Sequence, residues 1–189
     1  MNSALIPVFP LQLVVFPDEV INLHIFEPRY KQMLSEAEAM GTTFGVPTYI
    51  EKKDLSYGTE VKLKEIVKKY PDGKIDVRIQ GIKVFKIVNF IPRMNGRLYS
   101  GADISYIETE RKINIDKNTK IIGLLANLYQ YLKMHKPLPT SPNSFDSYKI
   151  AHFIGLSLED ELKLLAISIE EDRQDFIIKH LEHIIPVLR

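Results

Sequence analysis

Short apolar runs separated by prolines fill the first 26 residues of the chain. They lie at residues 6–11, 14–17 and 20–26. Proline has no backbone N–H to donate, so it belongs at the starts, edges and bends of strands rather than in the middle of a paired strand. The pattern therefore predicts two or three short strands over residues 5–26, with bends at the prolines.

The next segment has the 3.6-residue period of a helix. Pro28 suits the first helical position, and the charge of Glu27 at the cap meets the positive end of the helix dipole. Gly41 suits a left-handed cap at the end of the helix. The apolar side chains that recur on one face are Tyr30, Met33, Leu34, Ala37 and Met40. The spacing predicts a helix over residues 28–40.

The chain then returns to the two-residue period of strands. The clearest feature is a hairpin in which residues 61–70 and 74–80 flank residues 71–73 (Pro-Asp-Gly), a turn whose proline fixes φ and whose glycine permits positive φ. A shorter strand is expected within residues 43–50. A last strand is expected over residues 97–107, with a pairing partner that is not adjacent in sequence.

Within these strands the apolar positions change phase twice. The first change falls between Leu63 and Ile66, and the second between Val84 and Phe85. Each change predicts a β-bulge or a strong bend, which a small closed sheet requires. Gly81 lies between two strand runs and is a candidate for the corner of the sheet.

From about residue 115 the apolar period changes to 3.6 residues. Asp116 is the expected cap of a first helix, which the proline-containing stretch 137–144 ends. Ser144 is expected to cap a short helix, and Ser157 begins a further helix in a pattern that resembles a capping box. The apolar faces of the first and last helices carry Ile121, Leu124, Leu125, Leu128, Leu132, Phe176, Ile177, Leu181, Ile184, Ile185 and Leu188.

This change of period predicts two domains. Residues 1–108 form a β-rich lobe and residues 109–189 form a helical lobe, joined by a charged connector. Because the helical lobe is rich in apolar faces for its size, we expect it to dock on the β lobe.

Composition narrows the classes of function. The chain has 189 residues, of which 45% are hydrophobic, enough for a real core. A formal net charge of +1 gives no electrostatic case for nucleic acid or an anionic membrane as the main partner. Cysteine is absent, which excludes disulfides and thiolate metal sites. No apolar run approaches the ~20 residues of a membrane-spanning helix, and prolines interrupt any signal-peptide pattern, so a soluble cytoplasmic protein is expected.

Several segments together resemble one known family, the LON substrate-binding domain, which is the N-terminal domain of Lon proteases and also occurs as a free-standing protein. The segments that carry the resemblance are residues 6–17, 25–30, 44–46, 58–61 and 71–85. The helical tail, residues 146–187, is similar to the helical lobe of the free-standing members. The resemblance thus spans nearly the whole chain.

The resemblance implies an α+β fold: an N-terminal β-rich pseudo-barrel of PUA-like type with one inserted helix, followed by a C-terminal helical bundle. In Lon this domain helps to select unfolded or tagged polypeptides ahead of an ATPase ring. The chain has no Gly-x-x-x-x-Gly-Lys-Ser/Thr phosphate loop and is far shorter than an ATPase plus a serine–lysine protease domain. We therefore expect a non-enzymatic module that binds protein or polypeptide.

The expected partners are unfolded or flexible polypeptide segments, with a protease or chaperone as a further partner. The candidate binding residues are Phe16, Tyr30 and Phe85. No catalytic, cofactor-binding or metal-binding residue is expected, and no cofactor. His180 and His183 share one helix face, but a metal site needs a third ligand, which the sequence does not offer nearby.

Alternatives remain open. Arg29 and Tyr30 at the helix start form either a polar recognition patch beside an apolar groove or a plain helix start, with Arg29 paired to a carboxylate and Tyr30 in the core. A small-molecule pocket between the lobes is a second function class. An RNA-binding PUA-like module is a third, and its basic residues would be Lys62, Lys64, Lys68, Lys69, Lys74, Arg78, Lys83 and Lys86.

Overall fold

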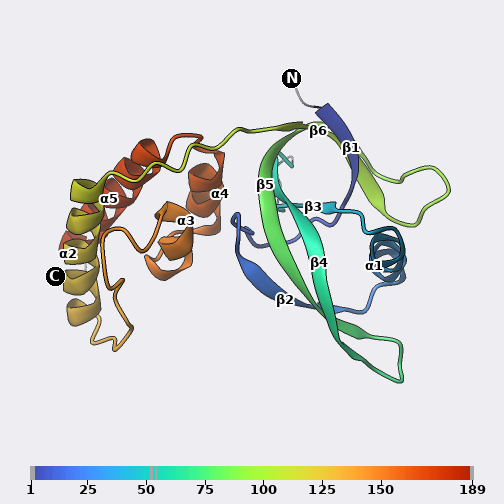
Figure 1. The fold of residues 1–189 in the computed structure, drawn as a ribbon, viewed down its shortest axis with the longest axis horizontal. Helices are drawn as coiled ribbons and strands as arrows, with labels where there is room; N and C mark the ends of the chain where they lie inside the picture. The colour runs from blue at the N-terminus through green and yellow to red at the C-terminus, as the bar shows by residue number, and fades with distance from the viewer. Residues whose placement is uncertain (1–2, 52, 54, 188–189) are drawn as a thin grey trace. The chain divides into compact units, whose positions relative to one another are not determined.

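The computed structural model describes residues 3–187 except 52 and 54. Within them, residues up to 107 form one unit of strands with a single α-helix, and residues from 108 form a second unit of helices (Figure 1). Each unit is described by itself below. The predicted α+β class is confirmed, and docking of the helical lobe on the β lobe stays a prediction.

The first unit is a six-stranded sheet with one helix inserted after the second strand. Its elements are β1 (Ser3–Val8), β2 (Val20–Ile25), α1 (Pro28–Met40), β3 (Phe44–Pro47), β4 (Tyr57–Lys69), β5 (Ile75–Ile91) and β6 (Ser100–Tyr106). The strand order is β2-β5-β4-β3-β1-β6, and β6 also pairs with β5. The second pairing joins five strands into a ring with β2 outside it, so the six strands together do not close as a barrel. The predicted pseudo-barrel is confirmed in this partly open form.

The weakest join of the ring is the parallel contact between β1 and β3. It pairs Val8 with Gly45 and continues past the strand ends through hydrogen bonds from the amides of Phe9 and Leu11 to the carbonyls of Gly45 and Pro47, 2.8 and 3.1 Å long. By contrast β6, predicted to pair with a distant strand, is antiparallel to β1 over six residue pairs and also pairs with β5. Pro10 therefore lies where the chain leaves β1 and the pairing is weakest, whereas Pro7 lies within β1, opposite Gly101 of β6.

The predicted hairpin is the arch of β4 and β5 (Figure 1). Gly73 has a φ of 77°, which a residue without a Cβ adopts at little cost. The first predicted irregularity is present, because the β4–β5 register shifts between Leu63 and Glu65. The second was predicted between Val84 and Phe85, where the pairing with β4 is regular; the skipped residue is instead Ile82, between the pairs that Lys83 and Gly81 make with β4. These bulges let the two long strands curve instead of lying flat.

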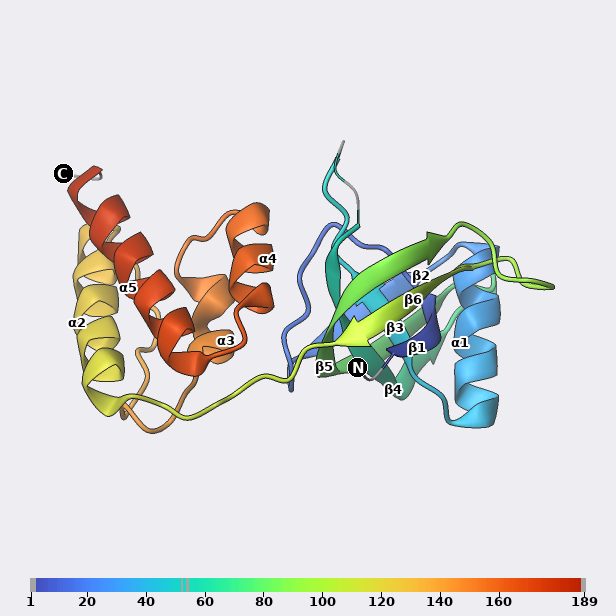
Figure 2. The same cartoon turned by 90° about the horizontal axis from the view of Figure 1, so that it is seen from above.

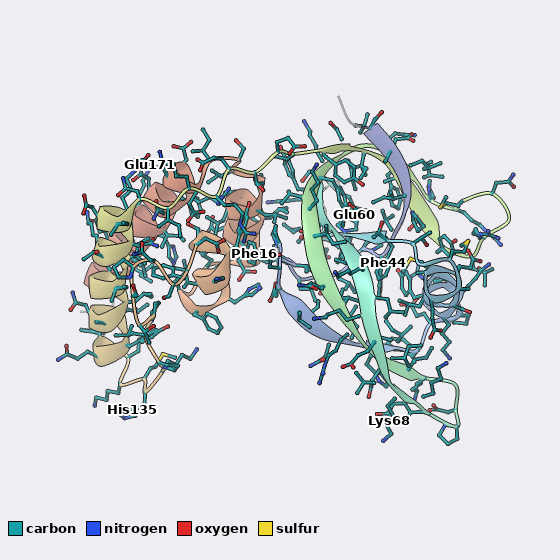
Figure 3. All side chains as sticks on the ribbon, viewed as in Figure 1. Phe16, Phe44, Glu60, Lys68, His135 and Glu171 are labelled. Atoms are coloured by element: carbon teal, nitrogen blue, oxygen red, sulfur yellow. The ribbon has the colours of Figure 1, made fainter. Side chains whose placement is uncertain are left out.

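Helix α1 packs its apolar face against the concave side of the curved sheet. Its buried residues are Tyr30, Met33, Leu34 and Ala37, which lie in one core with Phe44 of β3 (Figure 3). Gly41 ends the helix with a φ of 63°, as predicted. Met40 is 61% exposed, so its assignment to the buried face was wrong. It is the last residue before the cap, where the helix no longer faces the sheet.

The second unit is helical. It contains α2 (Ile115–Tyr131), α3 (Ser147–Ile150), a single 3₁₀ turn η1 (Ala151–Phe153), α4 (Leu158–Ala166) and α5 (Glu170–Val187). Helices α2 and α5 lie side by side, as Figures 1 and 2 show. Leu132 is 44% exposed, contrary to its predicted place on the apolar face, and Leu188 lies outside the described residues. None of the described helices has the length and apolar composition to cross a bilayer.

The caps of this unit correct two sequence predictions. Asn114, not Asp116, caps α2, because its side-chain oxygen accepts hydrogen bonds from the amides of Asp116 and Lys117. Asp146, not Ser144, caps α3 by accepting from the amide of Lys149. Ser157 caps α4 as predicted. In both wrong cases a second good capping residue lies two positions away, and the sequence alone does not rank them.

Replacing Asn114 by Ala is expected to lower the free energy of opening of α2 by about 1–2 kcal/mol, because two helix amides lose their acceptor. Asp116→Asn removes only a charge near the helix dipole and is expected to cost about 0.3–1 kcal/mol. Amide hydrogen exchange on α2 measures both values. Equal losses of stability in the two variants would mean that Asn114 is not the residue that caps α2.

Candidate functional site

A hollow of about 680 Å³ lies in the first unit, beside the start of α1. The helix start contributes Arg29 and Tyr30, and the far end of β5 contributes the run from Ile87 to Phe90. Pro10 and the segment after β3 complete it. The hollow thus gathers four separate parts of the sequence, all within one unit.

The helix start is built so that Arg29 and Tyr30 border this hollow. Pro28 fixes the first turn, and the Arg29 guanidinium pairs with Glu27 at 2.7 Å while lying 4.5 Å from the centre of the Tyr30 ring. The Tyr30 ring stacks on Phe9, with ring centroids 3.7 Å apart. Both interpretations of this motif therefore hold at once: the pair is a well-packed helix start, and it also lies beside a partly apolar hollow.

The electrostatics of the hollow favour contact rather than proton transfer. Burial raises the pKa of Tyr30, an effect that the neighbouring Arg29 charge opposes. The phenol therefore stays neutral at ordinary pH. Among the residues that the structure describes, those that line the hollow include Arg29 and Lys53 but no carboxylate and no serine or threonine hydroxyl.

Apolar side chains of the hollow are open to solvent. Val88 is 68% exposed, and Tyr49 and Phe90 are about 40% exposed. Ile87, which also lines the hollow, is buried and belongs to the sheet core. Such a surface can bury apolar or aromatic side chains of a bound molecule.

Sequence reasoning found Tyr30 but missed Tyr49, Val88 and Phe90. The available signal was the run from Ile87 to Ile91, in which four of five residues are apolar although only one strand face can be in the core. An apolar side chain on the second face of a strand is either covered by another element or exposed.

The other two predicted binding residues lie in the protein interior. Phe16 and Phe85 are 1% and 0% exposed, and neither lines the hollow. The Phe85 ring fills the space above Gly45 and Gly58, where any Cβ would lie within 3 Å of it. The structure therefore does not bring the three candidates together. Binding of polypeptide by these residues stays a prediction.

The sheet also has one unpaired margin. Strand β2 ends the strand order, so among the described strands only β5 pairs with it. Val20, Asn22 and His24 alternate along β2 as its exposed residues. An extended chain could add to such an edge by backbone hydrogen bonds.

Three of the five histidines act as hydrogen-bonding groups. His24 Nδ1 lies 2.6 Å from Asp76, His152 Nδ1 lies 2.7 Å from Glu161, and His180 Nε2 lies 3.1 Å from the carbonyl of Ile154. In the described part of the chain, no group of three His, Cys, Asp or Glu side chains could hold a metal ion.

The basic hairpin is interleaved with acids that pair with it. Arg78 pairs with Glu65 at 2.6 Å and Lys74 with Asp72 at 2.7 Å. Lys68, near the far end of the hairpin in Figure 3, lies over the ring of Tyr70, 4.5 Å from its centre. These contacts dilute the positive field that a nucleic-acid site needs.

Solved structures define the class of fold. The chain is similar to the Lon N-terminal domain protein from Xanthomonas campestris, with 23% identity, a TM-score of 0.71 and coverage of 95% of this chain and 98% of that one. It is also similar to the N-terminal domain of the Mycobacterium avium complex Lon protease, with 14% identity, a TM-score of 0.68 and the same coverages. The two-unit architecture is therefore that of a Lon N-terminal domain.

The sequence places the chain in a family. Residues 5–183 match the family model of the ATP-dependent protease La (LON) substrate-binding domain, and the chain belongs to this family. It is 25% identical over 197 residues to Lon protease 1 of Hydrogenovibrio crunogenus (strain DSM 25203 / XCL-2). That match covers 93% of this chain but only 23% of the protease. The resemblance inferred from the sequence is confirmed.

Proposed function

We propose that this chain is a non-catalytic module that binds unfolded or flexible polypeptide segments in the cytoplasm. The observation that carries the proposal is the hollow beside α1, in a chain of the LON substrate-binding family. Its apolar side chains are exposed, and its polar groups offer no evident nucleophile. Binding without chemistry fits this arrangement best.

The proposed contact has two parts. Apolar side chains of the bound segment are buried against Tyr49, Val88 and Phe90, which supplies affinity without a defined sequence. Backbone pairing along β2 adds hydrogen bonds that any sequence can make. Such binding is weak and tolerant, as a module that meets many different chains requires.

A protease or chaperone is the proposed second partner. The chain aligns with 23% of Lon protease 1, so the remaining parts of that protein have no counterpart in the match. We propose that a separate protein acts on the polypeptides that this module holds.

The test is a pair of matched variants of the full chain. Val88→Asn with Phe90→Asn removes exposed apolar area from the hollow, and we expect affinity for a permanently unfolded test protein to fall about tenfold, from the loss of about 1–2 kcal/mol of apolar burial. The control is Val67→Asn, a 51% exposed valine on β4 that does not line the hollow. Fluorescence anisotropy of the labelled test protein measures its affinity for the unchanged chain, for the double variant and for the control.

Two results would count against the proposal. Equal affinity of the two variants and the unchanged chain would remove the hollow as the binding surface. Binding of RNA that weakens steeply with salt, with no binding of unfolded protein, would replace the proposal by the nucleic-acid alternative. Circular dichroism of each variant establishes that the fold is retained.

A further inference from the structure

A groove of about 570 Å³ lies wholly within the second unit. It runs between α2, the loop that follows α2, where Figure 3 labels His135, and the segment from α3 to η1. Its walls are apolar: Leu125 and Tyr129 come from α2, and Ile150 comes from α3. Phe153 is 53% exposed at the groove, so part of the apolar surface meets solvent.

The charged groups on this groove are all positive. Lys136 comes from the loop and Lys149 from α3, and no lining residue is acidic. Lys136 Nζ lies 5.8 Å from the centre of the Phe153 ring, and Lys149 Nζ donates a 3.4 Å hydrogen bond to the carbonyl of Ser144. Within the described residues neither lysine is in an ion pair.

Some other lysines of the same unit have their charges offset by carboxylates. Lys117 lies 2.7 Å from Asp175, and Lys163 lies 2.7 Å from Asp160. The groove therefore combines an apolar interior with two cations that form no ion pair within the described residues.

We infer that this groove binds an apolar segment of a partner polypeptide that carries acidic side chains beside its apolar ones. Apolar residues of the partner are buried against Leu125 and Ile150, while Asp or Glu side chains pair with Lys136 and Lys149. Two cations on separate elements fit two acidic side chains better than one terminal carboxylate. The site is separate from the hollow of the first unit, so this inference does not depend on that surface.

The test uses short synthetic peptides and the full chain. One peptide alternates Leu and Phe with Asp and Glu, and its partner has Asn and Gln in place of the acids; both are acetylated and amidated. At low salt the acidic peptide is expected to bind about tenfold more tightly, as two exposed ion pairs of about 0.5–1 kcal/mol each allow. The advantage is expected to shrink as salt screens the charges.

Two double variants assign the effect to the groove. Lys136→Gln with Lys149→Gln is expected to abolish the preference for the acidic peptide, while binding of the neutral peptide persists. Lys112→Gln with Lys179→Gln changes the net charge equally at two lysines that do not line the groove, and is expected to keep the preference.

Three outcomes would overturn the inference. One is equal affinity of the unchanged chain for the two peptides. Another is equal loss of preference in both double variants, which would mean a general charge effect. The third is a neutral peptide with a free C-terminal carboxylate binding as tightly as the acidic one, which would assign the groove to chain ends. The Val88→Asn, Phe90→Asn variant is expected to leave the preference for the acidic peptide unchanged, whatever it does to the affinity for both peptides, which separates this test from that of the hollow.

Discussion

Replacing Glu170 by Gln is expected to destabilise the helical unit by about 3–5 kcal/mol, because it leaves the Arg173 guanidinium buried without a counter-charge. Both side chains are 0% exposed, and Arg173 Nε donates to Glu170 at 2.9 Å. Arginine stays protonated at any ordinary pH, so the chain cannot relieve the cost by losing a proton. The free energy of opening of α5, from amide hydrogen exchange, measures the loss.

The size of this effect follows from what the pair connects. Arg173 also donates to the carbonyls of Ile167 and Glu110, each at 2.6 Å, and Glu170 accepts from the amide and hydroxyl of Ser147 at 2.8 and 2.9 Å. These contacts join the start of α5 to the connector, to the end of α4 and to α3. Breaking the pair therefore loosens the whole unit rather than one helix.

Replacing the other member of the pair, Arg173, by Met is expected to destabilise the unit by an amount that depends on pH. Burial raises the pKa of Glu170, and Arg173→Met removes the positive charge that opposes this effect. A carboxyl group with a raised pKa in the folded state contributes its full stability below its ordinary pKa, and loses it as pH rises through the raised value. Arg173→Met should therefore be closer to the unchanged chain at pH 5 than at pH 8, whereas Glu170→Gln has no carboxyl group at this position to titrate.

The neighbouring Glu171 is the matched control. It is exposed and pairs with Lys117 at 3.1 Å, so Glu171→Gln is expected to change stability by less than about 0.5–1 kcal/mol. A similar loss of stability in Glu170→Gln and Glu171→Gln would show that the buried pair contributes no more than the exposed one. A pH-independent penalty for Arg173→Met would show that Glu170 does not take up a proton in the folded variant.

These two glutamates also show where sequence reasoning stops. An acidic run such as that from Glu170 to Asp172 is typical of a helix start, where the charges complement the dipole, and all three residues lie in the first turn of α5. Exposure divides them, because Glu170 faces Ser147 and Arg173 while Glu171 faces solvent. The i to i+3 spacing of Glu170 and Arg173 is visible in the sequence, but burial of the pair depends on α3, which lies more than 20 residues earlier.

The strands could be predicted from neighbours in sequence, whereas the binding site could not. Periods of two and 3.6 residues, prolines and the 71–73 turn were enough to predict the main elements, because each depends on neighbours in sequence. The candidate binding residues were chosen among aromatic side chains of apolar runs. Their burial depends on distant segments: Phe85 is covered because two glycines, Gly45 and Gly58, leave room for its ring. No local pattern separates it from the exposed Phe90.

Gly81→Ala is expected to destabilise the first unit by about 3 kcal/mol, the upper end of what overpacking usually costs. A Cβ on Gly81 would lie 2.2 Å from the carbonyl oxygen of Phe16, far inside contact distance. That oxygen belongs to the backbone, so no side-chain rotation can relieve the clash. Either β5 or the segment around Phe16 must move.

Movement there disturbs the corner of the sheet. The amide of Gly81 donates to the carbonyl of Glu19 at 2.9 Å, and its carbonyl accepts from the amide of Asp18 at 3.0 Å. Gly81 also follows directly on the part of β5 that pairs with β2 and precedes the part that pairs with β6. The same residue thus fixes the turn after the Phe16 segment and the passage of β5 between two partner strands.

The same substitution at Gly123 is a control with the opposite sign. Gly123 lies within α2 and a Cβ there meets no atom within 4 Å, so Gly123→Ala is expected to stabilise that helix by about 0.5–1 kcal/mol. Amide exchange on β2 and β5 measures the first effect, and exchange on α2 the second. If Gly81→Ala leaves exchange in β2 and β5 unchanged, the close approach of β5 to Phe16 does not hold the corner. In that case the curvature of the sheet depends on the bulges of β4 and β5 instead.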